Sequence, residues 1–177
     1  RKTFTCDEDI RETLTSIYFE GVYMNARVYV NGHDLGIYPY GYSSFCHDLT
    51  PYLQPGVNVL AVRVDNSGQK NCRWYTGSGI YRNVKLIRTP RLHFAQWGTF
   101  IHTTTQGNET QVQVETAIAN ERTEPSSFVL RAIVSYQGEE EAAVQCPVTL
   151  EAGETRTIRL SVPMSDARLW SPETPNL

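Results

Sequence analysis

The chain has 177 residues, of which 40% are hydrophobic and 20% charged, and its formal net charge is −3. This length allows one or two domains and is too short for a (β/α)₈ barrel, which needs about 250 residues. The hydrophobic fraction is that of a folded chain, and no apolar run approaches the roughly 20 residues of a membrane span. A nearly neutral balance argues against nucleic-acid binding, which a basic surface would favour. The composition therefore indicates a small globular protein that binds neither nucleic acid nor a membrane.

The first half of the chain reads as strands joined by tight turns. Apolar residues alternate with polar ones, which is the period of a strand with one buried face. The expected strands cover residues 17–19, 26–30, 35–37, 60–64 and 80–86. Asn31-Gly32 lies between two of them and predicts a two-residue hairpin, because a type I′ turn needs positive φ at both central residues. Only residues 7–14 could form a helical turn or two.

The second half repeats this pattern with fewer aromatic residues. Alternation covers residues 112–118, 128–134 and 158–162, with polar breaks at 121–126, 137–141 and 151–154. Roughly seven short strands at this spacing are typical of an immunoglobulin-like sandwich. Residues 1–89 carry 10 basic and 8 acidic side chains, a net charge of +2, whereas residues 90–177 carry 6 and 11, a net charge of −5. We therefore predict an all-β chain of two β-sandwich domains, 1–89 and 90–177.

Both ends of the sequence look trimmed. The chain opens on Arg1, with neither an initiator Met nor the pattern of a signal peptide. Residues 169–177 contain two prolines within four positions, which indicates a linker. The four cysteines allow three disulfide connectivities if they are oxidised, and they form no C-x-x-C pair that would favour zinc. Buried or half-buried free thiols are the alternative.

No motif in the sequence predicts a cofactor, a metal site or a catalytic pair. Gly77 to Arg82 begins like a dinucleotide fingerprint, but an arginine replaces the third glycine and no helix follows to hold a phosphate. The four histidines are scattered, which favours surface or strand-end positions over metal ligation. Glycoside hydrolysis needs two carboxylates that flank one bond. Asp34, Asp48 and Asp65 instead lie at expected turns, where Asp commonly accepts backbone hydrogen bonds.

The most unusual stretch runs from Asn71 to Arg82 and gathers planar donors, aromatic rings and glycines. Sugars are bound by aromatic rings against their C–H faces and by polar side chains against their hydroxyls, so one interpretation is a sugar site. The other interpretation is packing, in which Trp74, Tyr75 and Tyr81 close the end of a sandwich and Arg82 pairs with an aspartate. The choice between an aromatic platform and cross-strand packing also applies to the alternating Tyr38, Tyr40 and Tyr42.

Five motifs follow one another in a recognisable order. They are residues 19–22 (Phe-Glu-Gly-Val), 28–33 (Val-Tyr-Val-Asn-Gly-His), 41–50 (with Gly41-Tyr42, Phe45 and Asp48-Leu49-Thr50), 59–66 and 73–82. Together they resemble the N-terminal sugar-binding domain of family 2 glycoside hydrolases, which include β-galactosidases, β-glucuronidases and β-mannosidases. The Arg-Trp-Tyr-x-Gly-x-Gly-Ile-Tyr-Arg form of 73–82 resembles the β-galactosidase branch most. The second half resembles the family's immunoglobulin-like domain, and residues 169–177 resemble the seam that leads into its catalytic barrel.

The resemblance implies a retaining hydrolase whose catalytic glutamates lie in a (β/α)₈ barrel that is absent from this sequence. The family's acid/base glutamate follows an asparagine, but Asn108-Glu109 and Asn120-Glu121 lie in turn-like stretches and do not fit that motif. We therefore expect no catalytic residue in this chain. The family's first domain begins upstream of Arg1, so the resemblance also implies a partial jelly roll with missing opening strands. An incomplete sheet exposes an edge, which invites pairing with another chain and makes a homo-oligomer an expectation.

In the family, the loop before Gly77 reaches toward the active-site mouth of the barrel. The resemblance therefore implies substrate-side contacts with a β-galactoside-like carbohydrate. The candidate residues are Asn66, Asn71, Arg73, Trp74 and Tyr75. A non-catalytic fragment of a β-galactosidase-like enzyme would use them to shape one wall of the substrate pocket and would also support the barrel.

Two other classes of protein remain open at this stage. A free-standing carbohydrate-binding module shares the aromatic-rich sandwich but would bind sugar alone, and a structural interaction domain would bind none. The compartment is also open. The family resemblance favours a bacterial periplasm or cell surface, whereas cysteines without evident partners would suit a reducing cytoplasm.

Overall fold

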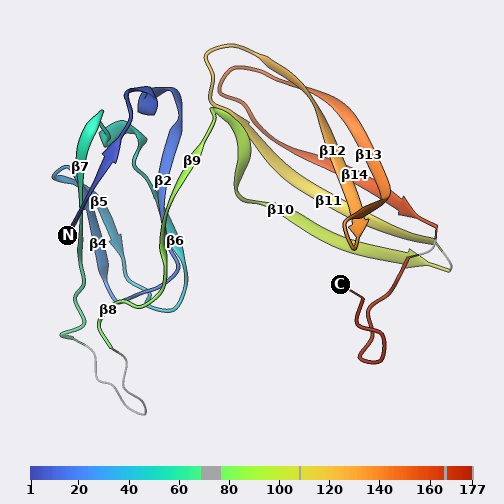
Figure 1. Ribbon diagram of the computed structural model, residues 1–177, viewed down its shortest axis with the longest axis horizontal. Helices are drawn as coiled ribbons and strands as arrows, with labels where there is room; N and C mark the ends of the chain where they lie inside the picture. Colours follow the sequence, from blue (N-terminus) through green and yellow to red (C-terminus); the bar gives the residue numbers. More distant parts are fainter. Residues whose placement is uncertain (69–76, 108, 166, 177) are drawn as a thin grey trace. The chain divides into compact units, whose positions relative to one another are not determined.

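The computed structural model describes residues 1–68, 77–107, 109–165 and 167–176. The chain divides into two compact units, Arg1–Pro90 and Arg91–Leu177. Each described unit is built from antiparallel strands, with two short 3₁₀ segments in the first (Figure 1). The all-β fold class with two sandwiches is therefore confirmed. Among the described residues, no helix has the length and apolar character needed to cross a membrane.

Two sheets and a small ladder make up the first unit. The four-stranded sheet has the order β1 (Lys2–Cys6), β7 (Gly56–Arg63), β4 (Ala26–Val30), β5 (His33–Tyr38). The three-stranded sheet has the order β6 (Phe45–Asp48), β2 (Leu14–Phe19), β9 (Val84–Thr89). A two-stranded ladder pairs β3 (Val22–Tyr23) with β8 (Gly79–Ile80) at the lower end of the unit in Figure 1. The 3₁₀ segments are η1 (Glu8–Glu12) and η2 (Thr50–Tyr52).

The core of the first unit lies between its two sheets. Ile17 and Phe19 of β2 are fully buried, and so are Val28 and Val30 of β4. Because alternate residues of a strand point to the same face, each strand contributes its apolar set to the same interior. Phe45 of β6 stacks on Phe19 with a centroid separation of 4.8 Å. Burial of each such side chain stabilises the fold by about 1.5–3 kcal/mol before cavity effects.

The β9 edge of the three-stranded sheet is only partly covered. Val84 and Leu86 of β9 pair in register with Phe19 and Ile17 of β2, so all four side chains point to the same, inner face. Phe19 and Ile17 are 0% and 1% exposed, whereas Val84 and Leu86 are 39% and 49% exposed. Inward-facing apolar side chains at β9 therefore lack the cover that their neighbours on β2 have.

The Asn31-Gly32 hairpin has the predicted geometry. Both residues have positive φ, 49° and 86°, and Val30 pairs with His33 across the turn between β4 and β5. The Asn31 side chain also makes two hydrogen bonds outside the turn. Its amide donates to Asn58 Oδ1 at 2.8 Å, and its Oδ1 accepts from the Val59 amide at 2.8 Å. The turn is thereby bonded to β7, the neighbouring strand of the sheet.

Two details of the first half differ from the sequence prediction or refine it. The strand expected over residues 80–86 is broken, because Tyr81 to Asn83 leave the ladder between β8 and β9. Tyr81 instead donates its backbone amide to the Gly21 carbonyl and its hydroxyl to the Gly41 carbonyl. The helical turns expected within residues 7–14 form as the 3₁₀ segment η1, in which Ile10 is buried.

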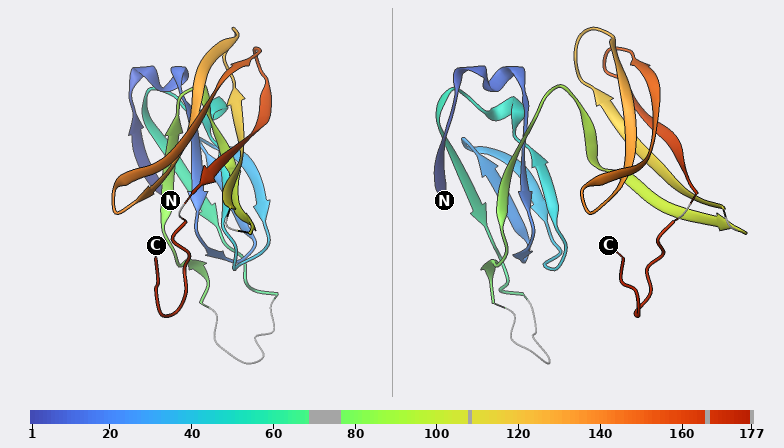
Figure 2. Two further views of the ribbon diagram at one scale, coloured as in Figure 1. Left: turned by 90° about the vertical axis from the view of Figure 1, so that its right-hand side faces the viewer. Right: turned by 45° about the vertical axis from the view of Figure 1, so that its right-hand side comes forward.

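The second unit packs a hairpin on a three-stranded sheet. The sheet has the order β10 (Leu92–Gln106), β11 (Glu109–Asn120), β14 (Thr155–Met164). The hairpin joins β12 (Ser126–Tyr136) to β13 (Glu139–Leu150) and packs mainly against β14 (Figure 2). Ile118, Leu130, Leu150 and Leu160 form the centre of this core. The polar breaks fall where the sequence predicted them, but the described residues hold five long strands rather than about seven short ones.

A β-bulge explains why β10 escaped the sequence prediction. The register between β10 and β11 shifts between Phe94 and Thr99, and Trp97 in this interval has a φ of 52°. Four residues of β10 (95–98) lie opposite the single residue Ala117 of β11, and an odd number of extra residues moves the following side chains to the opposite face. The apolar residues on either side of the bulge therefore do not share one alternating pattern.

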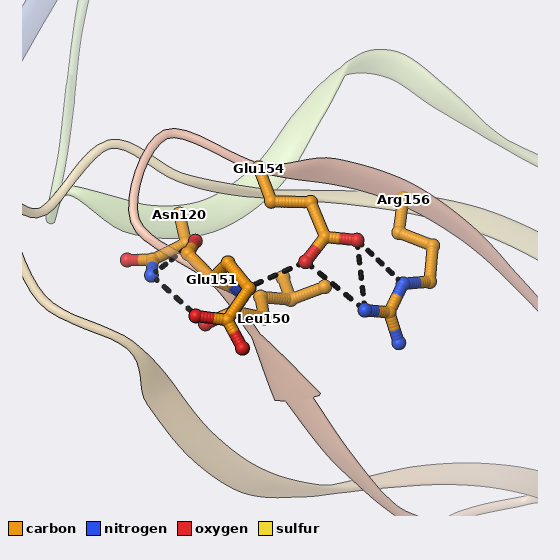
Figure 3. A network of polar contacts seen from close by, with 5 residues as sticks. All are labelled: Asn120, Leu150, Glu151, Glu154 and Arg156. Atoms are coloured by element: carbon orange, nitrogen blue, oxygen red, sulfur yellow. Dashed lines mark hydrogen bonds and ion pairs between the residues drawn. The ribbon is translucent and has the colours of Figure 1, made fainter.

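Asn120 connects three segments of the second unit (Figure 3). Its side chain is fully buried, and Nδ2 donates to the carbonyls of Glu124, Leu150 and Glu151 at 3.0, 3.2 and 2.9 Å. Oδ1 accepts from the Ser126 hydroxyl at 3.2 Å. Nearby, Glu154 accepts from the Glu151 amide and pairs with Arg156, which lowers the pKa of the Glu154 carboxyl. Asn120 therefore has a structural role.

Three of the four cysteines are free thiols. Cys6, Cys46 and Cys146 are half-buried and unpaired, and Cys72 lies outside the described residues. Burial raises the pKa of the Cys46 thiol, which keeps it in the protonated, weakly nucleophilic form.

Candidate functional site

Three tyrosines surround a pocket at the β3–β8 end of the first unit. The pocket has a volume of about 280 Å³ and is lined by Tyr23, Tyr42, Gly77, Ser78 and Tyr81. Tyr23 belongs to β3, which pairs with β8 through Tyr23–Gly79 and Val22–Ile80. We call this site the tyrosine pocket. Among the described residues, its lining consists of aromatic rings, the Ser78 hydroxyl and the Gly77 backbone, without a charged side chain.

Two glycines allow the tyrosine rings to pack directly on the backbone. A Cβ atom at Gly41 would lie 2.2 Å from the Tyr23 ring, and one at Gly21 would lie 2.6 Å from the Tyr81 ring. The Tyr81 hydroxyl donates to the Gly41 carbonyl at 2.8 Å. Tyr42 meets Tyr23 edge to face, with centroids 5.2 Å apart. The side chains that line the pocket are therefore held by close contacts.

Asn25 fixes the segment that follows β7 and leads to Asn66. It has a φ of 50°, a conformation that Asn tolerates better than most residues. Its side-chain amide donates to the Asp65 carbonyl at 2.8 Å, and the Asp65 amide donates to the Met24 carbonyl at 3.1 Å. Asp65 in turn accepts from the backbone and hydroxyl of Ser67, which lowers the pKa of the Asp65 carboxyl. Asn66 thus follows a segment with a fixed backbone.

Asn66 presents an unused hydrogen-bond acceptor. Its Nδ2 donates to the Ser78 hydroxyl at 3.1 Å, which fixes the orientation of the side-chain amide. Its Oδ1 is buried and has no hydrogen-bond partner among the residues that the structure describes. A buried acceptor without a partner carries a free-energy cost of about 1–3 kcal/mol. A donor supplied from outside the described residues would remove that cost.

The structure places only one of the five candidate site residues. Asn66 lies beside Ser78 of the tyrosine pocket, whereas Asn71, Arg73, Trp74 and Tyr75 lie outside the described residues. The sequence analysis missed Tyr23 as a pocket residue, because it sits in an apolar run that reads as core. The Gly41-Tyr42 pair was the available signal, since a glycine in a strand region often marks a close approach of side chain and backbone.

The tyrosines at 38, 40 and 42 divide between the two predicted roles. Tyr38 stacks on Phe45 at 4.4 Å and bonds to Ser43, so it packs in the first unit. Tyr40 and Tyr42 are exposed and meet edge to face at 5.9 Å. Tyr42 continues into the tyrosine pocket. Arg82 lies over the Tyr81 ring at 5.9 Å, a cation–π contact where the packing interpretation expected an aspartate.

The aspartates examined as possible catalytic groups serve their own turns, as the sequence predicted. Asp34, Asp48 and Asp65 each accept a backbone amide two residues on, at 3.0, 2.9 and 3.1 Å. Arg27 also pairs with Asp34 and holds the pKa of that carboxyl below its usual value. Among the described residues, no group of three or more His, Cys, Asp or Glu side chains is placed to hold a metal ion.

Both units match glycoside hydrolases. Residues 1–90 match the model for the sugar binding domain of glycosyl hydrolases family 2, and residues 93–177 match a second model of glycosyl hydrolases family 2. The chain therefore belongs to glycosyl hydrolases family 2. The family resemblance inferred from the sequence is confirmed, and the two sandwiches are the family's jelly-roll and immunoglobulin-like folds.

The similar proteins that we compared are much longer glycosidases. The chain is 42% identical to the beta-galactosidase BoGH2A of Bacteroides ovatus over its whole length, but it spans 21% of that protein. It is 30% identical to a beta-glucuronidase of Formosa agariphila over 96% of this chain and 20% of that one. The crystal structure of a family 2 member from Bacteroides cellulosilyticus superposes with a TM-score of 0.91 at 35% identity, over 99% of this chain and 24% of that chain. The chain thus spans about a fifth of the length of the curated relatives it matches.

Proposed function

We propose that this chain is a non-catalytic part of a retaining glycoside hydrolase of the β-galactosidase type. Within that enzyme it would shape one wall of the substrate pocket and support a catalytic barrel that lies beyond these residues. The proposal is supported by the identity to a beta-galactosidase over the whole chain and by the fifth of that relative's length that the chain spans. The two domains, 1–89 and 90–177, would then precede the barrel, with residues 169–177 as the linker.

The observation that carries the proposal is the tyrosine pocket, beside which Ser78 orients the Asn66 amide. A sugar offers a C–H face to aromatic rings and hydroxyl groups to polar side chains. We propose Asn66, Asn71, Arg73, Trp74 and Tyr75 as the substrate-side residues for a β-galactoside-like carbohydrate. Asn66 is the member of this set whose surroundings are described, and its amide is already oriented by Ser78.

The chain alone would not cleave glycosides. Retaining hydrolysis needs two carboxyl groups about 5–5.5 Å apart across the scissile bond. None of the residues that line the tyrosine pocket is acidic, and Asn120, which precedes Glu121, is fully occupied by structural hydrogen bonds. These observations support a role in binding and shaping rather than in bond cleavage.

The experiment is a turnover assay with the purified 177-residue chain and 4-nitrophenyl β-galactoside. The expected result is no nitrophenol release above that of a heat-denatured sample. The positive control is the same two units expressed with the barrel of the beta-galactosidase of Bacteroides ovatus. Turnover by the 177-residue chain would overturn the proposal, and loss of that turnover in Glu121→Gln or Glu109→Gln would locate the missed carboxylate.

A free-standing carbohydrate-binding module is the second candidate. It is favoured by the tyrosine pocket itself, whose described lining residues belong to the first unit. Calorimetric titration with galactose-containing oligosaccharides separates the two functions. Micromolar binding that is lost in Tyr42→Ala supports the module, whereas no binding supports a pocket that needs the barrel. A purely structural interaction domain would bind no sugar in either setting.

We also propose that the jelly roll is incomplete at its N-terminal side and that the β9 edge accepts a further strand. The exposure of Val84 and Leu86 on the inner face supports this, because a neighbouring strand would cover both. Unpaired strand edges readily pair with other strands. In the isolated chain a second copy would fill this position and form a homo-oligomer.

A further inference from the structure

The outer face of the three-stranded sheet in the second unit carries a row of polar side chains in register. His102 of β10 pairs with Gln113 of β11, and Gln113 pairs with Ser161 of β14. Their neighbours Val114 and Leu160 point to the opposite side, into the core. We call the outward surface the amide face. Its members are Phe100, His102, Thr104, Gln106, Glu109, Gln111, Gln113, Glu115, Arg159, Ser161 and Pro163.

Three side chains at the centre of the amide face hold one another in place. Gln113 Nε2 donates to Gln111 Oε1 at 3.1 Å and to Ser161 Oγ at 2.8 Å, and Ser161 Oγ donates to Gln111 Oε1 at 2.9 Å. This arrangement leaves the Gln111 amide nitrogen and the Gln113 amide oxygen without a hydrogen-bond partner among the described residues. The bonds among these three side chains hold the two amides in fixed orientations, which lowers the entropic cost of binding a ligand.

An aromatic pair lies beside these amides. The rings of Phe100 and His102 are stacked, with centroids 5.3 Å apart and an angle of 29° between their planes. Phe100 is 62% exposed, so its ring presents an open apolar surface. Further along the same face, Thr104, Gln106, Glu109 and Gln111 line a small depression of about 100 Å³. Phe100 and Gln106 are six residues apart on one strand, a span of about 20 Å.

The charge distribution selects a neutral ligand. The ion pair between Arg159 and Glu115, at 3.2 Å, lies at one end of the amide face, and Glu109 lies at the other. Apart from Pro163, the side chains between them are amides, hydroxyls and aromatic rings. The charges of Arg159 and Glu115 compensate each other and Glu109 would repel a polyuronate, whereas vicinal hydroxyls of a neutral sugar can both donate to and accept from amides.

We propose that the amide face is a binding surface for a neutral polysaccharide, separate from the tyrosine pocket. One sugar residue would lie on Phe100, and the hydroxyls of the following residues of the polysaccharide would bond first to Gln113, opposite His102, and then to Gln111, opposite Thr104. The surface belongs to the second unit alone, and the proposal does not depend on the function of the tyrosine pocket. Such a surface would hold the protein on an extended glycan while another site acts on a chain end.

The test is affinity electrophoresis of the 177-residue chain in native gels that contain soluble β-1,4-galactan, xyloglucan or galactomannan. We expect at least one of these polysaccharides to retard the chain and polygalacturonate not to do so. Phe100→Ala and Gln113→Ala should each weaken the retardation at least tenfold in apparent Kd. Phe94→Ala is the matched control, because Phe94 is 60% exposed on the same strand but faces the opposite side of the sheet.

Two results would overturn the proposal. One is the absence of retardation by all three neutral polysaccharides. The other is retardation that persists in Phe100→Ala and Gln113→Ala but is lost in Tyr42→Ala, since this would assign the binding to the tyrosine pocket. Thermal unfolding of each variant shows whether it is folded. Because Phe100→Ala and Gln113→Ala lie on different strands, the test remains valid if one of them fails to fold.

Discussion

The Tyr81 hydroxyl donates a hydrogen bond to the Gly41 carbonyl at 2.8 Å, across 40 residues of sequence. This bond joins the turn after β8 to the segment between β5 and β6, and both segments line the tyrosine pocket. Tyr81→Phe removes the bond and keeps the ring. We expect a loss of about 0.5–1.5 kcal/mol in the free energy of unfolding, measured by urea denaturation. Tyr40→Phe is the control, and equal losses in the two variants would contradict the role of the Tyr81 hydroxyl.

Gly41 is required because the Tyr23 ring occupies the space of a side chain. In Gly41→Ala the new methyl group would begin 2.2 Å from a buried ring, so either the ring or the backbone has to move. We expect a loss of about 1–3 kcal/mol in the free energy of unfolding. Gly68→Ala is the matched control, since nothing lies within 4 Å of its Cβ position. A Gly41→Ala variant as stable as Gly68→Ala would show that Tyr23 is not held as described.

Asn120 should be the most sensitive polar residue of the second unit. Asn120→Ala removes the donor from three carbonyl groups, those of Glu124, Leu150 and Glu151, and the bond to Leu150 is fully buried. We expect a loss of about 3 kcal/mol in the free energy of unfolding of this unit, followed by differential scanning calorimetry. Asn83→Ala is the control, because Asn83 is exposed and bonds only to Glu20 through its side chain. A loss below about 1 kcal/mol in Asn120→Ala would refute the structural role.

His47 predicts a pH dependence of stability. Burial lowers its pKa from the usual 6.5, and its Nε2 is buried without a hydrogen-bond partner among the described residues. The folded state therefore binds the proton more weakly than the unfolded state does. The contribution of the neutral His47 side chain to the free energy of unfolding is fully present above pH 6.5. It is lost as the pH falls through the folded-state pKa. Denaturation at pH 7.5, 6.5 and 5.5 should show this decline in the native sequence and a weaker one in His47→Gln. Parallel curves for the two proteins would contradict the assignment.

The β9 edge predicts self-association of the isolated chain. Leu86→Lys places a charge on the uncovered inner face, where a paired strand would have to bury it. Sedimentation velocity over a concentration series should show a weaker association in this variant than in the native chain. Ile133→Lys is the control, since Ile133 is similarly exposed but belongs to β12 of the second unit. A native chain that stays monomeric throughout the series would argue against strand addition at β9.

The strands were predictable where one face is buried and no bulge intervenes. In β2 and β4 buried residues alternate with half-buried or exposed ones along the strand, and the Asn31-Gly32 turn follows from backbone sterics alone. The irregularity around Trp97 could not be predicted, because extra residues inside a strand leave no local signature in an alternating pattern. The break at Tyr81 depends on partners about 40 and 60 residues away, namely Gly41 and Gly21.

The candidate site was predicted mainly through the family resemblance. The resemblance pointed to Asn66, and the structure adds the bond to Ser78 that orients it. Tyr23 was not predictable by composition, since a tyrosine in an apolar run is as compatible with a core as with a pocket wall. The close approach of its ring to Gly41 became visible only from the arrangement of the strands.

The pairing of β2 with β9 also governs how the first unit can form during synthesis. Leu14 pairs with Thr89, so β2 cannot pair with β9 until 75 further residues have been translated. At about 5–20 residues per second, this delay amounts to roughly 4–15 s on the ribosome. During that interval Ile17 and Phe19 lack the cover of the completed sandwich. Chaperones that bind exposed apolar strands could therefore bind the nascent chain during this interval. Their binding site would be removed when β9 joins the sheet.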